Sequence, residues 1–505
     1  MGDSTSWMWI HCLSDLDQLV VQRFWLVVSG SKVEWEPNGG EGALPFQLSN
    51  VCGFDDNFYR MSSTRRWRKV TAADSSPWAS LHEDLVSLVG WRVLAGDFQD
   101  YILFRAVCRH WRSSTTCPRG HGIVDPRFYP RRWMMLPEGH CQRWAVNTRG
   151  LHPGHGKLRG YVRFFNLSTG AFVRVKLPLF KDHYVLYSVD DILLLRREHD
   201  TAIRLLHAFT GDTADFPPLE TLSRYVRCRS EGEMWHFLRK ICGASISVGA
   251  DELVRVMMRP NQRTGICFAT SGDQQWRVTT TWERSNLSSN LPFQGKLYVL
   301  LRAQTVRDER VVIQIDPPQQ EGMDIGSLSV PSPKLVAKFK WPTSDTSYAS
   351  FYYRLAECNS EILVIGTKWD AVCYSVYRLA DLMLGRTVPL TPIDGNALFI
   401  GRRSLCVSSK VFPTIVPDTI VMRESKIYLS PWLSQYHLSN GTLSQATDGV
   451  IAEEKDIPGP YSIMCHIITC CSPPCWNKGK ILCKEMAPKW RVKKKFRYGR
   501  TINPA

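Results

Sequence analysis

Apolar residues recur at three- and four-residue steps within residues 77–113, and this spacing predicts amphipathic helix. The first helical run has one apolar stripe, made of Leu81, Leu85, Leu88 and Val89. Polar residues on the opposite side of the run are Glu83, Asp84 and Ser87. Because Ser80 and Glu83 have the spacing of a capping box, we expect the helix to begin there.

Gly96 ends this run, and a second helical pattern follows it. Asp97 or Asp100 is a suitable N-cap, because a carboxylate there accepts hydrogen bonds from free backbone N–H groups. The second apolar stripe consists of Tyr101, Phe104, Val107, Cys108 and Trp111. Helices this short need a partner surface to be stable. Periodicity alone does not decide whether that surface belongs to the rest of this chain or to another protein.

From about residue 158 to about residue 490 the pattern changes to short β-rich runs separated by turn residues. Three predicted hairpins have Ser-Thr-Gly, Thr-Gly and Ser-Asn-Gly turns that end at Gly170, Gly211 and Gly441. Gly170 and Gly211 are 41 residues apart. A recurrence of about 40 to 50 residues is typical of propeller blades, so we predict a β-propeller of about six blades. A large irregular β-sandwich is the alternative.

These patterns predict an α+β multidomain protein in which a small all-α helical module precedes a large all-β domain. The chain divides into an N-terminal extension without an assigned fold at 1–76, the helical module at 77–117, a Pro/Gly/Arg-rich linker at 118–157, the propeller-like domain at 158–490 and a basic tail at 491–505.

The helical module resembles the F-box, a small helical unit that docks on the Skp adaptor of a cullin-RING ubiquitin ligase. The residues that carry the resemblance are Leu81, Glu83, Asp84, Leu85 and Val89, followed by Phe104, Arg105, Ala106, Val107, Cys108, Trp111 and Arg112. His82 stands where the family usually has proline, and the GDFQDYIL segment is longer than the usual connection. The resemblance implies an adaptor contact through Leu81, Leu85, Val89, Phe104, Val107, Cys108 and Trp111.

The β-rich region is similar to the C-terminal domain of plant F-box proteins, known as domain of unknown function 295 or the KIB-type β-propeller. The segments that carry this similarity are GKLYVL, ECNSEILVIG, YSVYRLADL, DGNALFIGRRSLCVSS with FPTIVPDTIVM, and the ending that begins HIITCC. Together with the F-box-like stretch, the resemblance covers residues 77–498.

The net charge of +16 is concentrated near the C-terminus. Residues 476–500 contain ten basic residues and one acid, a net +9, which leaves about +7 for the other 480 residues. That remainder is too dilute to indicate a nucleic-acid surface, so nucleic-acid binding could rest only on the tail. The near-alternation of Trp490, Val492 and Phe496 favours a last β-strand there instead.

Sixteen cysteines occur at scattered spacings and we find no signal peptide, so we expect reduced intracellular thiols and no disulfides. Charged residues such as Asp15 and Arg23 interrupt the apolar run at 7–28 before it reaches the length of a membrane span. We therefore expect a protein of the cytoplasm, the nucleus or both, without membrane association.

The sequence lacks a P-loop, a GxSxG elbow, an HExxH motif, the kinase motifs and a GxGxxG turn that opens a helix. Possible zinc ligands without paired CxxC spacing are Cys465, His466, Cys470, Cys471, Cys475 and Cys483 near the C-terminus, and His140, Cys141, His152 and His155 in the linker. We expect no metal, no cofactor and no enzymatic activity.

The two resemblances imply the substrate-recognition subunit of a Skp-cullin-F-box E3 ubiquitin ligase. On this hypothesis the helical module binds the Skp adaptor, and through it the cullin, while the propeller binds an unknown target protein. One alternative is a propeller interaction scaffold with a degenerate F-box, which His82 would favour. The other is nucleic-acid binding through the basic tail.

Overall fold

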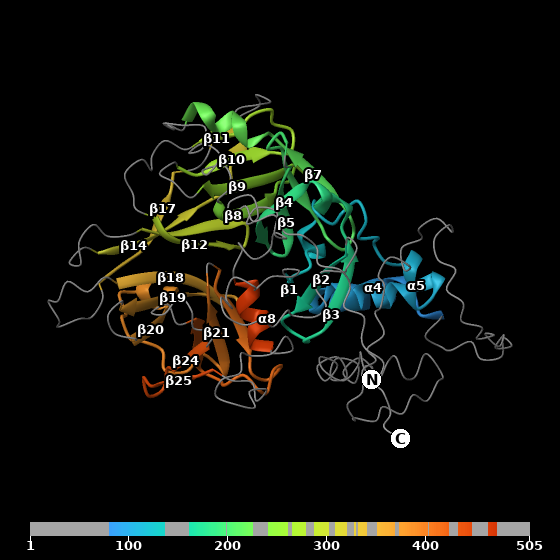
Figure 1. The fold of residues 1–505 in the computed structure, drawn as a ribbon. Helices are drawn as coiled ribbons and strands as arrows, with labels where there is room; N and C mark the ends of the chain where they lie inside the picture. The colour runs from blue at the N-terminus through green and yellow to red at the C-terminus, as the bar shows by residue number, and fades with distance from the viewer. Residues whose placement is uncertain are drawn as a thin grey trace, which may run out of the picture.

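The computed structural model shows a small helical module beside a ring of β-sheets (Figure 1). The residues that it describes are 80–136, 161–197, 199–225, 241–260, 265–278, 287–301, 309–320, 328–329, 332–340, 351–368, 373–401, 403–423, 433–446 and 463–471. The N-terminal extension and the basic tail with its predicted last strand lie outside these ranges. Within them, no helix is long and apolar enough to cross a membrane.

The helical module contains α3 (Glu83–Gly96), α4 (Phe98–Ala106) and α5 (Arg109–Ser113). The predicted capping box is wrong, because the ring of His82 caps α3 by accepting a hydrogen bond from the N–H of Asp84. Asp97 caps α4, as expected. The second helix is interrupted, however, because Cys108 leaves the helical conformation and its Sγ accepts from the N–H of Trp111 at the start of α5.

Six sheets form the blades of a β-propeller, and hydrogen bonding sets the order of the strands within each sheet. In spatial order, blade 1 has β1 (Trp133–Met135), β2 (Tyr161–Asn166) and β3 (Phe172–Lys176); blade 2 has β4 (His183–Val189), β5 (Ile192–Arg197), β6 (Ile203–Leu206) and β7 (Thr213–Phe216). Blade 3 has β11 (Arg277–Val278), β10 (Cys267–Thr270), β9 (Val254–Pro260) and β8 (Ile241–Val248); blade 4 has β12 (Leu287–Phe293), β13 (Lys296–Leu301), β14 (Arg310–Ile315) and β17 (Lys334–Phe339). Blade 5 has β18 (Phe351–Cys358), β19 (Glu361–Lys368) and β20 (Cys373–Arg378); blade 6 has β22 (Leu405–Ser408), β21 (Asn396–Ile400), β23 (Thr419–Arg423), β24 (Leu433–His437) and β25 (Leu443–Gln445).

The blades are antiparallel sheets, apart from the parallel pairing of β21 with β23 in blade 6. A short hairpin, β15 (Gln319–Gln320) and β16 (Leu328–Ser329), lies between β14 and β17 in the chain. Two short helices accompany the ring: α7 (Leu379–Met383) follows β20, and α8 (Ile463–Cys470) follows blade 6 in sequence. The 3-10 segments are η3 (Pro126–Phe128), η6 (Pro178–Lys181) and η7 (Leu219–Tyr225).

A buried apolar cluster lies between each pair of neighbouring blades. Five such clusters join consecutive blades, from the pair of blades 1 and 2 to the pair of blades 5 and 6. A sixth joins blade 6 to blade 1, for example through Phe399 and Phe165. Six sheets with six shared cores make a closed ring, because no blade can bury both faces alone. The prediction of about six blades is confirmed, and the β-sandwich alternative is wrong.

The predicted glycine turns repeat one local structure. The N–H groups of Gly170, Gly211 and Gly441 each donate to a carbonyl four residues earlier in the chain. All three glycines have φ between +70° and +80°, a region that is readily available only to glycine. The hairpins β2–β3, β6–β7 and β24–β25 are therefore built on the same turn, as the sequence indicated.

The boundaries of the propeller differ from those expected. β1 comes from the predicted linker, and its three residues are buried in blade 1. The segment HIITCC, expected within a final blade, forms most of α8 and its C-terminus. The Sγ of Cys470 lies 3.8 Å from the carbonyl oxygen of Met135, and that of Cys471 lies 3.6 Å from that of Phe399. α8 therefore closes the junction between blades 1 and 6.

The expectation of no disulfide is also wrong. Cys358 of blade 5 and Cys406 of blade 6 are bonded to each other. Spacing in the sequence could not reveal this pair, because the two residues are brought together only by the packing of two blades.

Candidate docking surface of the helical module

The inner face of α3 is held close to the other helices by a glycine. Val86, Gly90 and Leu94 are buried there at helical spacing. A methyl group at Gly90 would lie 2.9 Å from the Cγ2 of Thr115 and 3.4 Å from the ring of Phe104. Only a residue without a side chain allows α3 to approach so closely, so Gly90 defines which face of α3 points inward.

A second apolar stripe, which begins just before α3 and continues along it, faces outward. Leu85 and Leu88 are 50% and 56% exposed, and Leu81 is partly exposed. We call Leu81, Leu85 and Leu88 the outer stripe. The sequence pattern placed these leucines on one apolar face of the helix. It did not show that the core is filled by other residues, on a different face of the same helix. Leu88 was not among the predicted adaptor contacts, although its spacing from Leu81 and Leu85 could have included it.

The structure separates the seven residues assigned by resemblance into exposed, intermediate and core positions. Leu85 and Val107 are exposed, Trp111 is only 2% exposed, and the partly exposed residues are Leu81, Val89, Phe104 and Cys108. The rings of Phe104 and Trp111 are 4.4 Å apart. Trp111 therefore belongs to the core of the module, whereas Leu85 and Val107 are available to a partner.

The buried guanidinium of Arg105 connects α4 to the chain that follows α5. It donates to the carbonyl oxygen of Thr115 and, at 2.9 Å, to its hydroxyl. The Thr115 hydroxyl in turn donates to the carbonyl of Trp111 at 2.7 Å. The hydroxyl of Tyr101 donates to the carbonyl of Thr116 at 2.7 Å. These contacts fix α4, α5 and the chain after α5 to one another without a side chain of the outer stripe.

Asp97 joins the module to blade 1. Its Oδ1 accepts from the N–H of Gln99 at 2.7 Å and caps α4. Its Oδ2 accepts from the indole N–H of Trp133 at 2.9 Å and from the amide of Asn166 at 2.6 Å. Burial raises the pKa of this carboxyl, and the hydrogen bonds oppose the increase. The cap could be predicted from the sequence but the junction could not, because Trp133 and Asn166 are distant in the chain.

A second set of contacts fixes the module to blade 2. Phe98 of α4 packs on the rings of His207 and Phe209 in the β6–β7 turn. The Nε2–H of His207 donates to the carbonyl of Phe128 at 3.0 Å, and its Nδ1 accepts from the N–H of Thr210. Burial lowers the pKa of His207 to about 4, so the ring is neutral at pH 7. The module and the propeller are therefore joined through both side chains and backbone.

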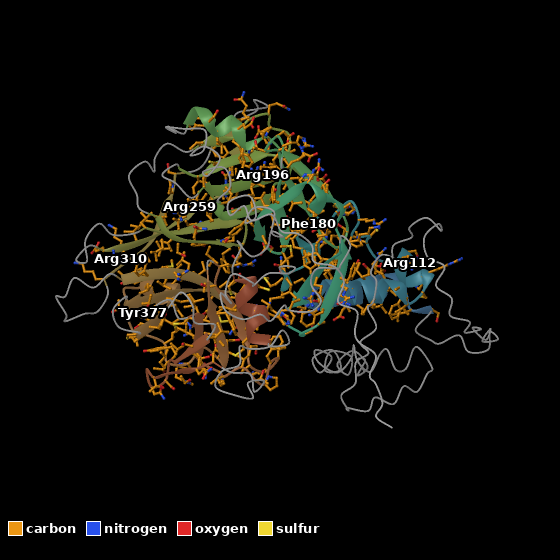
Figure 2. All side chains as sticks on the ribbon, viewed as in Figure 1. Arg112, Phe180, Arg196, Arg259, Arg310 and Tyr377 are labelled. Carbon is orange, nitrogen blue, oxygen red and sulfur yellow. A yellow bond between two sulfur atoms is a disulfide. The ribbon has the colours of Figure 1, made fainter. Side chains whose placement is uncertain are left out.

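The outer end of the module points away from the ring. Figure 2 shows the side chain of Arg112 extending from this end, on the side opposite the propeller. Arg109 and Arg112 are both exposed. A partner could therefore approach the outer end of the module without displacing any blade.

The described part of the chain holds no group of three or more His, Cys, Asp or Glu side chains arranged for a metal ion. Cys470 and Cys471 are buried against carbonyl groups of two blades, and burial raises the pKa of both thiols. His466 packs against the rings of Phe165 and Phe172. The side chain of Cys465 and, as whole residues, Cys475, Cys483 and the four possible ligands in the linker lie outside what the structure describes.

No curated protein matches the chain. Among solved structures, the propeller domain of Cps50 (Swd1) from Myceliophteria thermophila is 10% identical, with a TM-score of 0.27, and the match covers 63% of this chain and 79% of that one. An inactive variant of virginiamycin B lyase from Staphylococcus aureus is 10% identical, with a TM-score of 0.22 and coverage of 57% and 71%. The N-terminal domain of Nup159 is 9% identical, with a TM-score of 0.18 and the same coverage.

The family comparison is more specific. The model of the KIB1-4 β-propeller matches residues 164–461, which is more than half of the chain. This range includes β3 to β25 and thus nearly the whole ring. The chain belongs to the KIB1-4 β-propeller family.

Proposed function

We propose that this protein is the substrate-recognition subunit of a Skp-cullin-F-box E3 ubiquitin ligase, with the helical module docked on the Skp adaptor and the propeller bound to a target protein. The observation that carries the proposal is the outer stripe. It is apolar, its Leu85 and Leu88 are exposed, and the buried apolar cluster of the module does not include it.

Exposed leucines at adjacent turns of one helix face favour a protein partner. Covering such a side chain contributes about 1.5–3 kcal/mol, so burial of Leu85 and Leu88 together supports a specific complex. The order of residues in the module resembles the F-box, which indicates the Skp adaptor as that partner. The propeller supplies a large rigid surface for a protein target.

The proposed mechanism is proximity. The chain itself makes and breaks no bonds; it holds a target near the conjugating enzyme of the ligase and so raises the effective concentration of the target lysine. Contacts of Asp97 and His207 fix the module on blades 1 and 2, so a target on the propeller would be held at a constant distance from the adaptor. Such a receptor acts in the cytoplasm or the nucleus.

A pull-down of the full chain by a purified Skp adaptor tests the proposal. We expect the wild type to bind, and the Leu85→Asp, Leu88→Asp variant to lose at least about 100-fold in affinity, because two carboxylates would be buried in an apolar interface. Leu335→Asp is the matched control, since Leu335 of blade 4 is also 56% exposed but lies far from the module in sequence. Trp111 is not a suitable test position, because its truncation would disrupt the core.

The same experiment separates the proposal from the scaffold alternative. A wild-type chain that has the circular dichroism of a folded protein but does not bind the adaptor would contradict the ligase role. The protein would then be an interaction scaffold with a degenerate F-box.

A further inference from the structure

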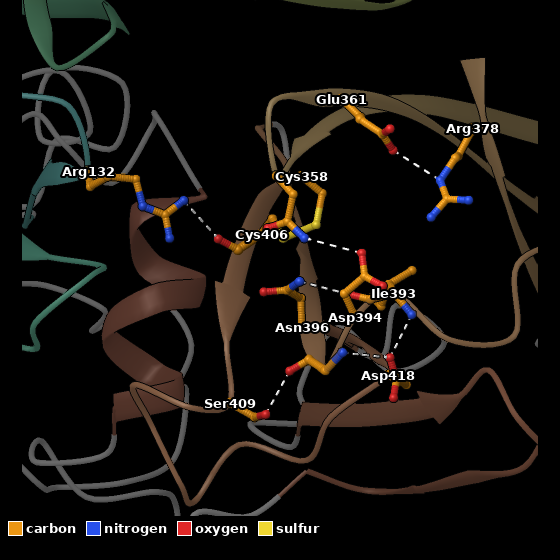
Figure 3. Close-up of a disulfide and its surroundings, with 12 residues drawn as sticks. Arg132, Cys358, Glu361, Arg378, Ile393, Asp394, Asn396, Cys406, Ser409 and Asp418 are labelled. Atoms are coloured by element: carbon orange, nitrogen blue, oxygen red, sulfur yellow. Dashed lines mark hydrogen bonds and ion pairs between the residues drawn. A yellow bond between two sulfur atoms is a disulfide. The ribbon is translucent and has the colours of Figure 1, made fainter. Parts of the chain in front are cut away.

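The disulfide joins two neighbouring blades at the inner side of the ring. Cys358 is the last residue of β18, and Cys406 lies in β22, the strand at one end of the blade 6 sheet (Figure 3). Their Cα atoms are 5.3 Å apart, which is within the usual range for a disulfide. Both cysteines are otherwise part of the apolar cluster between blades 5 and 6. The bond therefore crosses a boundary that side-chain packing already holds together.

A third blade meets this boundary at the same point. Arg132, which precedes β1, donates through its Nη1 to the carbonyl of Cys406 at 3.2 Å (Figure 3). Its Nε donates to the hydroxyl of Ser168 in the β2–β3 turn. The position of β22 is thus linked to blade 1 by hydrogen bonds and to blade 5 by the disulfide.

Other thiols whose side chains the structure describes remain free. They are Cys108, Cys117, Cys267, Cys373, Cys470 and Cys471, of which Cys117 and Cys373 are exposed. Exposed free thiols are typical of a reducing compartment, where a disulfide is usually a redox-responsive bond and not a permanent structural one.

The disulfide also lies next to an exposed two-residue turn. Asn359 and Ser360 form the β18–β19 turn directly after Cys358, and both are exposed. They have φ of 51° and 61°, a conformation that Asn tolerates but that costs energy for Ser. Local opening of this turn would expose the sulfur of Cys358 to a small thiol without unfolding either blade.

We propose that Cys358–Cys406 is a reversible redox bond that controls how often the boundary between blades 5 and 6 opens, with glutathione as its exchange partner. Formation converts two protein thiols and one glutathione disulfide into the protein disulfide and two glutathione thiols. In the reverse direction a glutathione thiolate attacks one sulfur, and a second glutathione resolves the mixed disulfide. The inference is independent of the proposed function, and its test needs no adaptor.

The first experiment equilibrates the full chain with buffers of graded ratios of reduced to oxidised glutathione. Free thiols are then blocked with one reagent, the disulfide is reduced, and the thiols released are labelled with a second reagent. Mass spectrometry quantifies both labels at Cys358 and Cys406. We expect a half-reduced protein at a ratio within the range of cellular glutathione pools, while Cys267 stays free throughout. Free Cys358 and Cys406 at every ratio would overturn the proposal, as would a bond that resists excess reductant until the protein unfolds.

Hydrogen exchange of the wild-type chain supplies a second readout that needs no substitution. We expect reduction to accelerate exchange at least tenfold in residues 405–408 and at the 359–360 turn, and to leave β5 of blade 2 unchanged. The Cys406→Ser variant should show the fast pattern under oxidising and reducing conditions alike, whereas Cys267→Ser should respond to glutathione as the wild type does. Equal exchange in both states of the wild type would contradict control of the boundary.

Discussion

At the scale of single residues, one carboxyl group connects protonation to stability. Asp191 follows β4 in a tight turn and is 1% exposed, and the Nη1 of Arg403 lies 3.8 Å from its Oδ1. Burial raises the pKa of Asp191 to about 8, although Arg403 opposes the increase. The carboxyl group is therefore largely protonated in the folded protein at neutral pH.

The pH dependence of stability follows from this. An ordinary Asp has a pKa of 3.8, so between about pH 4 and pH 8 the unfolded chain has lost a proton that Asp191 keeps in the folded state. The contribution of this group to stability is full at low pH and falls by about 1.4 kcal/mol per pH unit across that window. It levels off above pH 8.

We expect the Asp191→Asn variant to remove this slope. Asn keeps the shape of the side chain and tolerates the positive φ of 64° at this position. Denaturant unfolding at pH 5, 6, 7 and 8 measures the effect. The free energy of unfolding of the variant, relative to that of the wild type, should increase as the pH rises. A constant difference between the two proteins over this window would show that Asp191 does not titrate as described.

At the scale of elements, α3 shows what a sequence pattern can and cannot establish. Its periodicity correctly predicted a helix. It could not show which side faces inward, because α3 carries apolar residues on two faces and the inner one includes Gly90, which does not count as apolar. The glycine turns were easier to predict, since Gly170, Gly211 and Gly441 are local features that depend on backbone conformation alone.

Gly90 offers a test of the packing of α3. A Gly90→Val substitution would place methyl groups against Thr115 and Phe104, and we expect it to destabilise the module by about 1–3 kcal/mol. Gly96→Ala is the control, because no atom lies within 4 Å of its added methyl group and Ala has the higher helix propensity. Hydrogen exchange of α3 is the measurement, and equal protection in the two variants would contradict the close approach at Gly90.

At the scale of the whole molecule, the orientation of the module on the propeller depends on Asp97. An Asp97→Ala substitution removes the cap of α4 and leaves the donors of Trp133 and Asn166 without this acceptor. We expect a loss of about 2–4 kcal/mol in the free energy of unfolding. Loss of the helix cap costs about 1 kcal/mol, and the buried donors left without an acceptor cost about 1–3 kcal/mol.

The Asp97→Asn variant separates the contribution of the α4 cap from that of the contacts with blade 1. Asn is as good an N-cap as Asp, so this variant should keep α4 and lose only contacts at the junction. Denaturant unfolding gives the stability of each variant, and hydrogen exchange of α4 shows whether the cap is intact. Asp97→Asn should fall between the wild type and Asp97→Ala; an effect equal to that of Asp97→Ala would assign the whole cost to the junction.

The ring as a whole could be predicted only in part. The recurrence of strands and turns indicated blades, because each blade is made of residues close in the chain. The contact of blade 1 with blade 6, the disulfide, and the junction at Asp97 join residues that are distant in the sequence, and no local pattern specifies them. The same reason explains why β1 was assigned to the linker, as its three residues become a strand only beside β2.

Closure of the ring has a consequence for how the protein is made. The apolar side of blade 1 around Phe165 is covered by blade 6 and by α8, which are synthesised about 230 to 300 residues later. At a translation rate of about 5–20 residues per second, that surface remains uncovered for on the order of 10–60 s, until blade 6 and α8 have been synthesised. During this interval the nascent chain exposes an uncovered β-sheet face. We infer that the ribosome-bound intermediate, more than the finished ring, is the form of this protein that depends on chaperones.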